Sequence, residues 1–205
     1  MADGSDQMNE HQLTQDQWEA IENEIKATQP LTSPLLPISV LLQQYTKGDD
    51  SETNNNHEQQ GFIKGATFLS KKYNSLRKIR GDGNCYYRAF LYSLCEHLLR
   101  NLILNDNSQN AAVEFGRLKD LITKSLKWVC QYGYEEYTID MFYDELVELF
   151  DFIEKASLKK EDSTSDTNVL LESALQQLHT KLNEENAVSA DLFLFCMHTF
   201  YWGGA

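Results

Sequence analysis

The chain has little proline and no long apolar run. The first leaves most predicted helices uninterrupted, and the second argues against a membrane protein. Its three prolines all lie between residues 30 and 37, so proline interrupts no other predicted element. No apolar stretch is long enough to span a membrane. The N-terminal sequence "MADGSDQMNEHQLTQDQ" has neither the basic nor the apolar region of a secretory signal. We therefore expect a protein of the cytoplasm or the nucleus that does not bind membranes.

The cysteines show no CxxC pair, which argues against a metal site and against a disulfide framework. Cys85 and Cys95 are expected on one helix, ten residues and about 15 Å apart, which is too far for a disulfide. We interpret both, with Cys130 and Cys196, as reduced thiols. The five histidines and four cysteines form no pair with the spacing of zinc ligands, so we expect no metal and no cofactor.

Basic residues are scarce except in one short segment. The formal net charge is −13, but residues 61–100 carry eight Lys or Arg and two acids. A nucleic-acid-binding protein of this size is usually basic overall, so we expect no nucleic acid partner. The basic segment has two interpretations, which the sequence leaves open. It is either a solvated helix face or a source of positive potential that favours a thiolate.

Apolar residues recur at helical spacing through most of the chain. We expect a disordered acidic tail over residues 1–13, and one domain over residues 14–205. A connecting strand is predicted over residues 75–80, and Thr138 is predicted as an N-cap. The predicted helices cover residues 14–28, 38–47, 62–73, 85–99, 111–129, 139–153, 170–178 and 189–202.

Three details of this prediction concern packing and connections. The proline-rich stretch "TQPLTSPLLP" is expected to be a linker or turn, and "KKEDSTSDTN" a loop. The apolar stripes over residues 111–129 and 139–153 are expected to need a sheet to bury them. The buried side of the helix that starts at Cys85 is expected to carry Phe90, Leu91, Leu94, Leu98 and Leu99.

Cys85 follows a tight Asp-Gly-Asn turn and opens a helix, in the stretch "RKIRGDGNCYYRAFLYSLCEHLLR". A thiol attacks as the thiolate, and the N-terminus of a helix favours that form through its partial positive charge and unpaired N–H groups. The N–H groups of Asp82, Gly83, Asn84 and Cys85 are expected to point at one place, as in an oxyanion hole. The alternative is a plain turn that feeds a helix, with Cys85 as a small N-terminal residue.

The stretch "LRKIRGDGNCYYRAF" resembles the active-site segment of ovarian-tumour (OTU) deubiquitinating cysteine proteases, most closely the otubain branch. The segments "QPLTSPLLPISVLLQQY", "FLSKKYNSLRKIR", "GYEEYTIDMFYDELVEL" and "VSADLF" resemble otubains in the same order. This resemblance implies an α/β (α+β) papain-like fold of the otubain type. We expect the present part to be mostly helical and the C-terminal sheet to be largely missing, with the domain truncated at its C-terminus.

The resemblance also implies the chemistry and the partners. It implies a ubiquitin-specific thiol hydrolase that cleaves the isopeptide bond after the C-terminal glycine of ubiquitin. Cys85 is then the catalytic nucleophile, Asp82 a catalytic residue of the loop that shapes the oxyanion hole, and Gly83 and Asn84 complete that turn. The implied partners are ubiquitin or polyubiquitin, and also ubiquitin-conjugating enzymes.

No catalytic histidine is identified. His97 lies three turns along the helix of Cys85, and His179 and His198 lie in helical patterns that are typical of surface or interface residues. Two functions therefore stay open: a deubiquitinase, and a non-catalytic module that binds ubiquitin or a ubiquitin-conjugating enzyme. We expect that the 205-residue chain alone does not hydrolyse ubiquitin conjugates at a useful rate.

Overall fold

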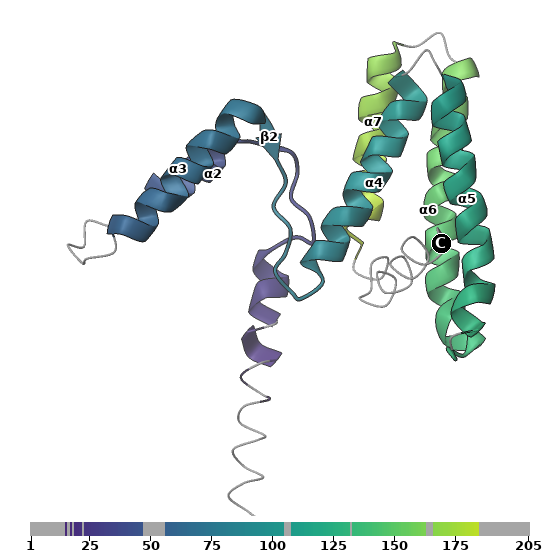
Figure 1. Cartoon of the computed structure of the whole chain (residues 1–205), viewed down its shortest axis with the longest axis horizontal. Coiled ribbons are helices and arrows are strands. Elements are labelled where there is room, and N and C mark those ends of the chain that lie inside the picture. Colours follow the sequence, from purple (N-terminus) through teal and green to yellow (C-terminus); the bar gives the residue numbers. More distant parts are fainter. Residues whose placement is uncertain are drawn as a thin grey trace, which may run out of the picture.

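Helices dominate the part of the chain that the computed structural model describes, which is residues 15, 17, 19–21, 23–46, 56–104, 108–131, 133–162 and 166–184 (Figure 1). Residues 23–28 are helical, as predicted. The longer helices are α2 (Ser39–Thr46), α3 (Asn56–Lys72), α4 (Cys85–Leu104), α5 (Ser108–Gln131), α6 (Glu136–Asp162) and α7 (Thr167–Lys181).

A two-stranded antiparallel sheet joins the proline-rich segment to the residues before Cys85. Strand β1 (Leu36–Pro37) pairs with β2 (Ser75–Leu76), and an isolated bridge continues the pairing between Thr32 and Ile79. The strand predicted over residues 75–80 is confirmed for Ser75–Leu76 only. The prediction that the whole proline-rich stretch is a linker or turn is wrong, because its last two residues, Leu36 and Pro37, form β1. Both strands of this sheet are edge strands, and an edge strand tolerates a proline, which has no N–H to donate.

The apolar core lies among α4, α5, α6 and α7. Helix α4 contacts each of the other three, and α5 and α6 lie side by side in Figure 1. The expectation that the stripes on α5 and α6 need a sheet is wrong, because these helices bury them against each other and against α4. The most deeply buried side chains of this core include Leu91, Leu99, Ile103, Ile122, Leu146, Phe150, Ile153 and Leu178.

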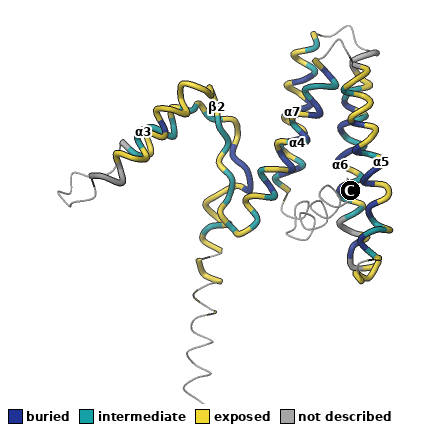
Figure 2. Tube along the Cα trace, viewed as in Figure 1, coloured by how far each residue is buried: buried dark blue, intermediate teal, exposed yellow. Residues whose placement is uncertain are grey.

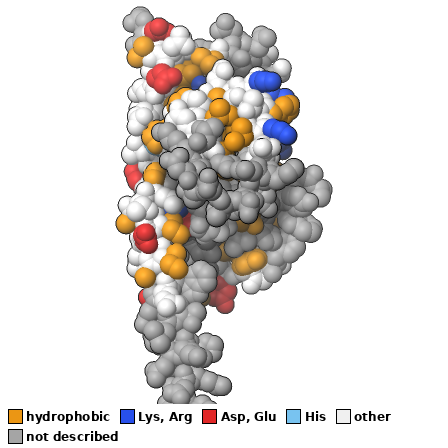
Figure 3. All heavy atoms as spheres, turned by 90° about the vertical axis from the view of Figure 1, so that its left-hand side faces the viewer, with side chains coloured by type: hydrophobic (Ala, Val, Ile, Leu, Met, Phe, Trp, Pro, Cys, Tyr) orange, Lys and Arg blue, Asp and Glu red, His pale blue; other side chains and the backbone are white. Residues whose placement is uncertain are grey.

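Helices α2 and α3 form a hairpin that projects from the rest of the molecule in Figure 1. Tyr45 of α2 stacks on Phe62 of α3, with ring centroids 5.2 Å apart. On α3 Ala66 is buried, whereas Phe62 is exposed, as is Tyr73 directly after the helix, so the predicted apolar stripe is mostly uncovered (Figure 2). Figure 3 views the molecule from this side and shows apolar side chains at the surface.

Several predicted boundaries and one core residue differ from the structure. Phe90 is 39% exposed, so its placement on the buried side of α4 is wrong; Leu91, Leu98 and Leu99 are buried as predicted. Helix α6 begins at Glu136, which puts Thr138 inside the helix and not at its N-cap. The helical pattern continues through charged residues to Asp162, so the predicted loop over residues 159–168 is too wide.

Some predictions fall on residues outside the described ranges: the acidic tail over residues 1–13, the helix over residues 189–202, Cys196 and His198. Among the helices that the structure does describe, none has an apolar stretch long enough to cross a lipid bilayer.

Candidate active site

The turn before α4 has the shape that its sequence predicts. Gly83 has a φ of +85°, a backbone conformation that glycine adopts without the strain met by other residues. Helix α4 then begins at Cys85, and the N–H of Arg88 donates to the carbonyl oxygen of Asn84 at 3.0 Å. The prediction that Cys85 opens a helix is confirmed. Its side chain is exposed, whereas Cys95 on the same helix is buried.

Two of the four N–H groups expected to form an oxyanion hole are used inside the turn. The N–H of Asp82 donates to the carbonyl oxygen of Arg80 at 3.1 Å, and the N–H of Asn84 donates to Oδ1 of Asp82 at 3.2 Å. The expectation that Asp82 and Asn84 also donate to an oxyanion is therefore wrong. Among the described residues, the N–H groups of Gly83 and Cys85 have no hydrogen-bond partner and stay available.

Asp82 is held by two arginines. Its Oδ1 and Oδ2 accept from the two terminal nitrogens of Arg88, at 3.0 and 2.8 Å, and Oδ2 also accepts from Nε of Arg80 at 3.1 Å. Burial alone raises the pKa of Asp82, but the hydrogen bonds from Arg88 and Arg80 outweigh it and hold this pKa below its ordinary value. The Asp82 carboxylate is thus ionised and fixed at neutral pH.

The arginines of the basic segment over residues 61–100 form ion pairs with the acids of the same segment. Its two acids each bind two arginines: Asp82 binds Arg80 and Arg88, and Glu96 pairs with Arg77 at 3.5 Å and with Arg100 at 2.7 Å. Two carboxylates face four guanidinium groups, so the charge of these arginines is offset only in part and the segment keeps a net positive charge.

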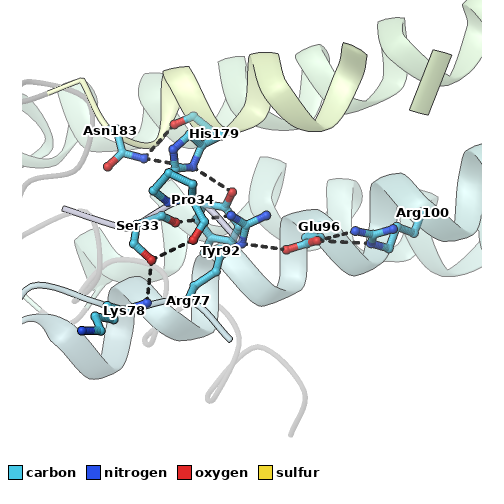
Figure 4. Close-up of polar contacts among 9 residues, drawn as sticks. All are labelled: Ser33, Pro34, Arg77, Lys78, Tyr92, Glu96, Arg100, His179 and Asn183. Carbon is cyan, nitrogen blue, oxygen red and sulfur yellow. Dashed lines mark hydrogen bonds and ion pairs between the residues drawn. The ribbon is translucent and has the colours of Figure 1, made fainter. Parts of the chain in front are cut away.

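His179 belongs to a polar network that joins α4 to α7 (Figure 4). The hydroxyl of Tyr92 lies 3.1 Å from Nδ1 of His179, and the amide of Asn183 lies 3.3 Å from the same nitrogen. Oδ1 of Asn183 accepts the backbone N–H of Thr32 at 2.8 Å, which directs the amide nitrogen toward the histidine. Burial first, and then the Arg77 guanidinium, lower the pKa of His179 below its ordinary value, although Glu96 raises it.

Neither histidine with a described side chain is placed as a base for Cys85. Tyr92, the partner of His179, follows Cys85 by seven residues, which is about 10 Å along the helix. His97 lies further along α4, where its Nε2 is 2.8 Å from the amide nitrogen of Asn101. His179 is an interface residue, as the sequence predicts.

A pocket of about 320 Å³ lies beside this network, between the segment before β1, Arg80, and the end of α7. Thr32, His179 and Asn183 border it, and Cys85 is not among its lining residues. Within the described ranges, the His, Cys, Asp and Glu side chains form no cluster of three that could hold a metal ion.

The role of Arg88 was not predicted from the sequence, although its position carries a signal. Arg88 precedes Leu91, Tyr92 and Cys95 at the spacing of one helix face, so a charged residue stands on the apolar stripe of α4. A buried guanidinium needs an acid nearby, and Asp82 is the acid in the turn that precedes the helix.

Comparison with known protein families identifies close relatives. The model of the family Peptidase C65 Otubain matches residues 24–188. Ubiquitin thioesterase OTUB1 of Homo sapiens is 37% identical over 139 residues, which are 68% of this chain and 44% of that protein. Ubiquitin thioesterase otubain-like of Caenorhabditis elegans is 34% identical over 146 residues, which are 70% of this chain and 42% of that protein. The chain thus spans less than half the length of these relatives.

Solved structures show the same fold. A complex of ceOTUB1 with ubiquitin aldehyde and UBC13~Ub matches 86% of this chain and 57% of that chain, with 28% identity and a TM-score of 0.56. A complex of h/ceOTUB1 with ubiquitin aldehyde and UBCH5B~Ub matches 90% and 59%, with 26% identity and a TM-score of 0.59. The expected otubain-type α+β fold is confirmed, and the chain belongs to the otubain family, Peptidase C65.

Proposed function

We propose that this chain carries the nucleophile of a ubiquitin-specific thiol hydrolase, and that the nucleophile is Cys85. The observation that supports this most directly is the position of the Cys85 thiol. It is exposed at the first residue of α4, directly after a turn whose Gly83 N–H, like that of Cys85, has no partner among the described residues. The helix N-terminus favours the thiolate there. The names of the relatives, ubiquitin thioesterases, indicate the substrate class.

The proposed reaction has two stages. The Cys85 thiolate attacks the carbonyl carbon of the C-terminal glycine of ubiquitin, and the N–H groups of Gly83 and Cys85 donate to the oxyanion that develops. The C–N bond then breaks, the lysine nitrogen takes a proton from the solvent and leaves as the amine, and ubiquitin stays on sulfur as a thioester. Water attacks the thioester, which releases ubiquitin with a free carboxylate and restores the thiol.

The partners follow from the same comparison. The solved relatives hold ubiquitin aldehyde and a ubiquitin-charged conjugating enzyme, UBC13~Ub or UBCH5B~Ub. We propose ubiquitin or polyubiquitin as the substrate and ubiquitin-conjugating enzymes as binding partners, in the cytoplasm or the nucleus. A second candidate function is a non-catalytic module that binds these partners. This function is favoured because the two histidines whose side chains the structure describes, His97 and His179, do not contact Cys85.

A turnover measurement separates the two functions. The 205-residue chain is incubated with ubiquitin that carries a fluorogenic amide at its C-terminus, and Cys85→Ala is the matched variant. Among the described residues, no histidine lies beside the sulfur of Cys85 to act as a base. We therefore expect the fluorophore to be released several orders of magnitude more slowly than by a cysteine protease whose nucleophile has its base. Release that Cys85→Ala leaves unchanged would refute the hydrolase. Undiminished binding of ubiquitin by Cys85→Ala, with no release by either protein, would establish the binding module.

A further inference from the structure

Arg88 is a charged side chain in a place where apolar side chains are the rule. It lies on α4 with only 4% of its side chain exposed, on the face that also carries Leu91, Tyr92 and Cys95. Burying a guanidinium costs free energy unless it is paired and hydrogen-bonded. Its Nε is buried and has no hydrogen-bond partner among the described residues, so the pairing is incomplete even in the folded chain. A purely structural role would be met better by an apolar residue.

The contacts of Arg88 are concentrated on the turn that precedes Cys85. One terminal nitrogen donates to the carbonyl oxygen of Arg80 at 3.3 Å and to Oδ1 of Asp82 at 3.0 Å, and the other donates to Oδ2 of Asp82 at 2.8 Å. Asp82 in turn accepts the N–H of Asn84. Arg88 therefore binds Asp82, the first residue of the turn, and Arg80, which precedes the turn, from a position three residues after Cys85.

This arrangement fixes the backbone on both sides of the sulfur. The same guanidinium that belongs to the first turn of α4 holds the residues that come before that turn. The planar fork of arginine matches the two oxygens of a carboxylate, which lysine cannot reproduce. The Gly83 and Cys85 N–H groups lie on the segment held in this way.

We propose that Arg88 is a positioning residue for Cys85: through both oxygens of Asp82 it fixes the turn that carries the Gly83 and Cys85 N–H groups. This role rests on the proposed function, because it requires that Cys85 is the nucleophile. Arg88 acts through the turn and does not itself touch the reacting atoms.

The test measures the alkylation of Cys85 by iodoacetamide in the full 205-residue chain, from about pH 5 to about pH 9, with peptide masses as the readout. The variants are Arg88→Met and Arg88→Lys. Arg100→Met is the matched control, because Arg100 lies on the same helix and binds Glu96. Cys130 is the internal control, because it is half-buried and belongs to another helix, α5.

We expect both Arg88 variants to react at Cys85 roughly tenfold more slowly near neutral pH, with the rate of Cys130 unchanged. Arg100→Met should react like the unsubstituted chain. An Arg88→Lys variant that keeps the full rate would overturn the proposal, since charge alone would then suffice. Faster labelling of Cys95 and Cys130 together would also overturn it, since the variant would merely have loosened the whole fold.

A double variant guards against misfolding of the single ones. Asp82→Leu with Arg88→Met removes both buried charges, and such replacements usually preserve stability. The proposal predicts a folded chain whose Cys85 still reacts slowly, whereas recovery of the full rate would show that only charge compensation matters.

Iodoacetamide needs no ubiquitin, so the outcome is independent of the substrate. If the unsubstituted chain fails to react with ubiquitin electrophiles, the proposed function fails while the positioning role is still tested.

Discussion

The hydroxyl of Tyr92 lies 3.1 Å from Nδ1 of His179, and this contact joins α4 to α7 across 87 residues of sequence. The two rings meet edge to face, with centroids 6.1 Å apart. Asn183 presents its amide nitrogen to the same Nδ1 while its oxygen accepts from Thr32. Because both neighbours can donate to Nδ1, the geometry favours a neutral imidazole with its proton on Nε2.

The stability of the chain should therefore depend on pH through His179. Its pKa is below the ordinary value of 6.5, because of burial and of Arg77, so the unfolded chain binds the proton more tightly than the folded chain. The free energy of unfolding should be fully present above about pH 6.5, and should fall as the pH drops from there toward the lower folded pKa. Thermal midpoints between about pH 5 and about pH 8 would show this slope.

The control for this prediction removes the titrating group. Glu96 and Tyr92 face His179 as well, so His179→Gln is the direct comparison. In that variant the slope near pH 6.5 should flatten. An unchanged slope would assign the titration to another group.

Asp82→Asn should destabilise the fold. It leaves the buried Arg88 guanidinium without its counter-ion, so we expect the free energy of unfolding to fall by roughly 3–5 kcal/mol. Urea unfolding measures this loss. Glu114→Gln is the control, because the Glu114–Arg117 pair is exposed and should leave the unfolding curve where it is. If the two variants unfold alike, the Asp82–Arg88 contact contributes nothing to stability.

The Asp82 pair should also be lost in acid. The pKa of Asp82 lies below its ordinary value of 3.8, so this carboxylate stabilises the fold fully above about pH 3.8. That contribution should disappear as the pH falls through the lower folded pKa. Acid unfolding of Asp82→Asn should lack this component. An acid transition with the same slope in both proteins would contradict the prediction.

Ile153→Ala should be costly, because the side chain of Ile153 is fully buried on α6 and leaves a cavity among the four core helices. We expect a loss of about 2–4 kcal/mol. Leu158→Ala lies on the same helix, but Leu158 is 55% exposed, so its effect should stay within about 0.5 kcal/mol. Chemical denaturation of both variants tests whether α6 packs in this register. Equal losses would place the buried face of α6 elsewhere.

Cys85 should be the first thiol to react in the folded chain. It is exposed, whereas Cys130 is half-buried and Cys95 is fully buried. Brief alkylation near neutral pH, followed by peptide mapping, should label Cys85 before the other two and before Cys196, which lies outside the described residues. Earlier labelling of Cys95 or Cys130 would show that burial does not protect them.

The sequence predicts the helices well because their apolar spacing is local information. The stripes on α5 and α6 identify both helices, and the Asp-Gly-Asn turn places the start of α4 at Cys85. What covers a stripe depends on distant residues, so the mutual packing of α5 and α6 could not be predicted from spacing alone. Phe90 shows the same limit, since it fits the helical period and yet is exposed.

The candidate site was predictable in part. Cys85 and its turn follow from the sequence, and the structure adds which N–H groups the turn itself uses. The link from Tyr92 to His179 was not predictable, because the two residues are far apart in the chain and neither has a local signal of pairing. Arg88 was predictable in principle, because a charge on the apolar stripe of a helix requires a nearby acid.

Covalent trapping tests the central claim most directly. The 205-residue chain is mixed with ubiquitin that carries an electrophile in place of its C-terminal carboxylate, and the site of any adduct is mapped by peptide mass. The account predicts one ubiquitin on Cys85, and no adduct on Cys85→Ser under the same conditions. An adduct on another cysteine, or none on Cys85 while iodoacetamide still labels it, would contradict the assignment of Cys85 as the nucleophile of a ubiquitin hydrolase.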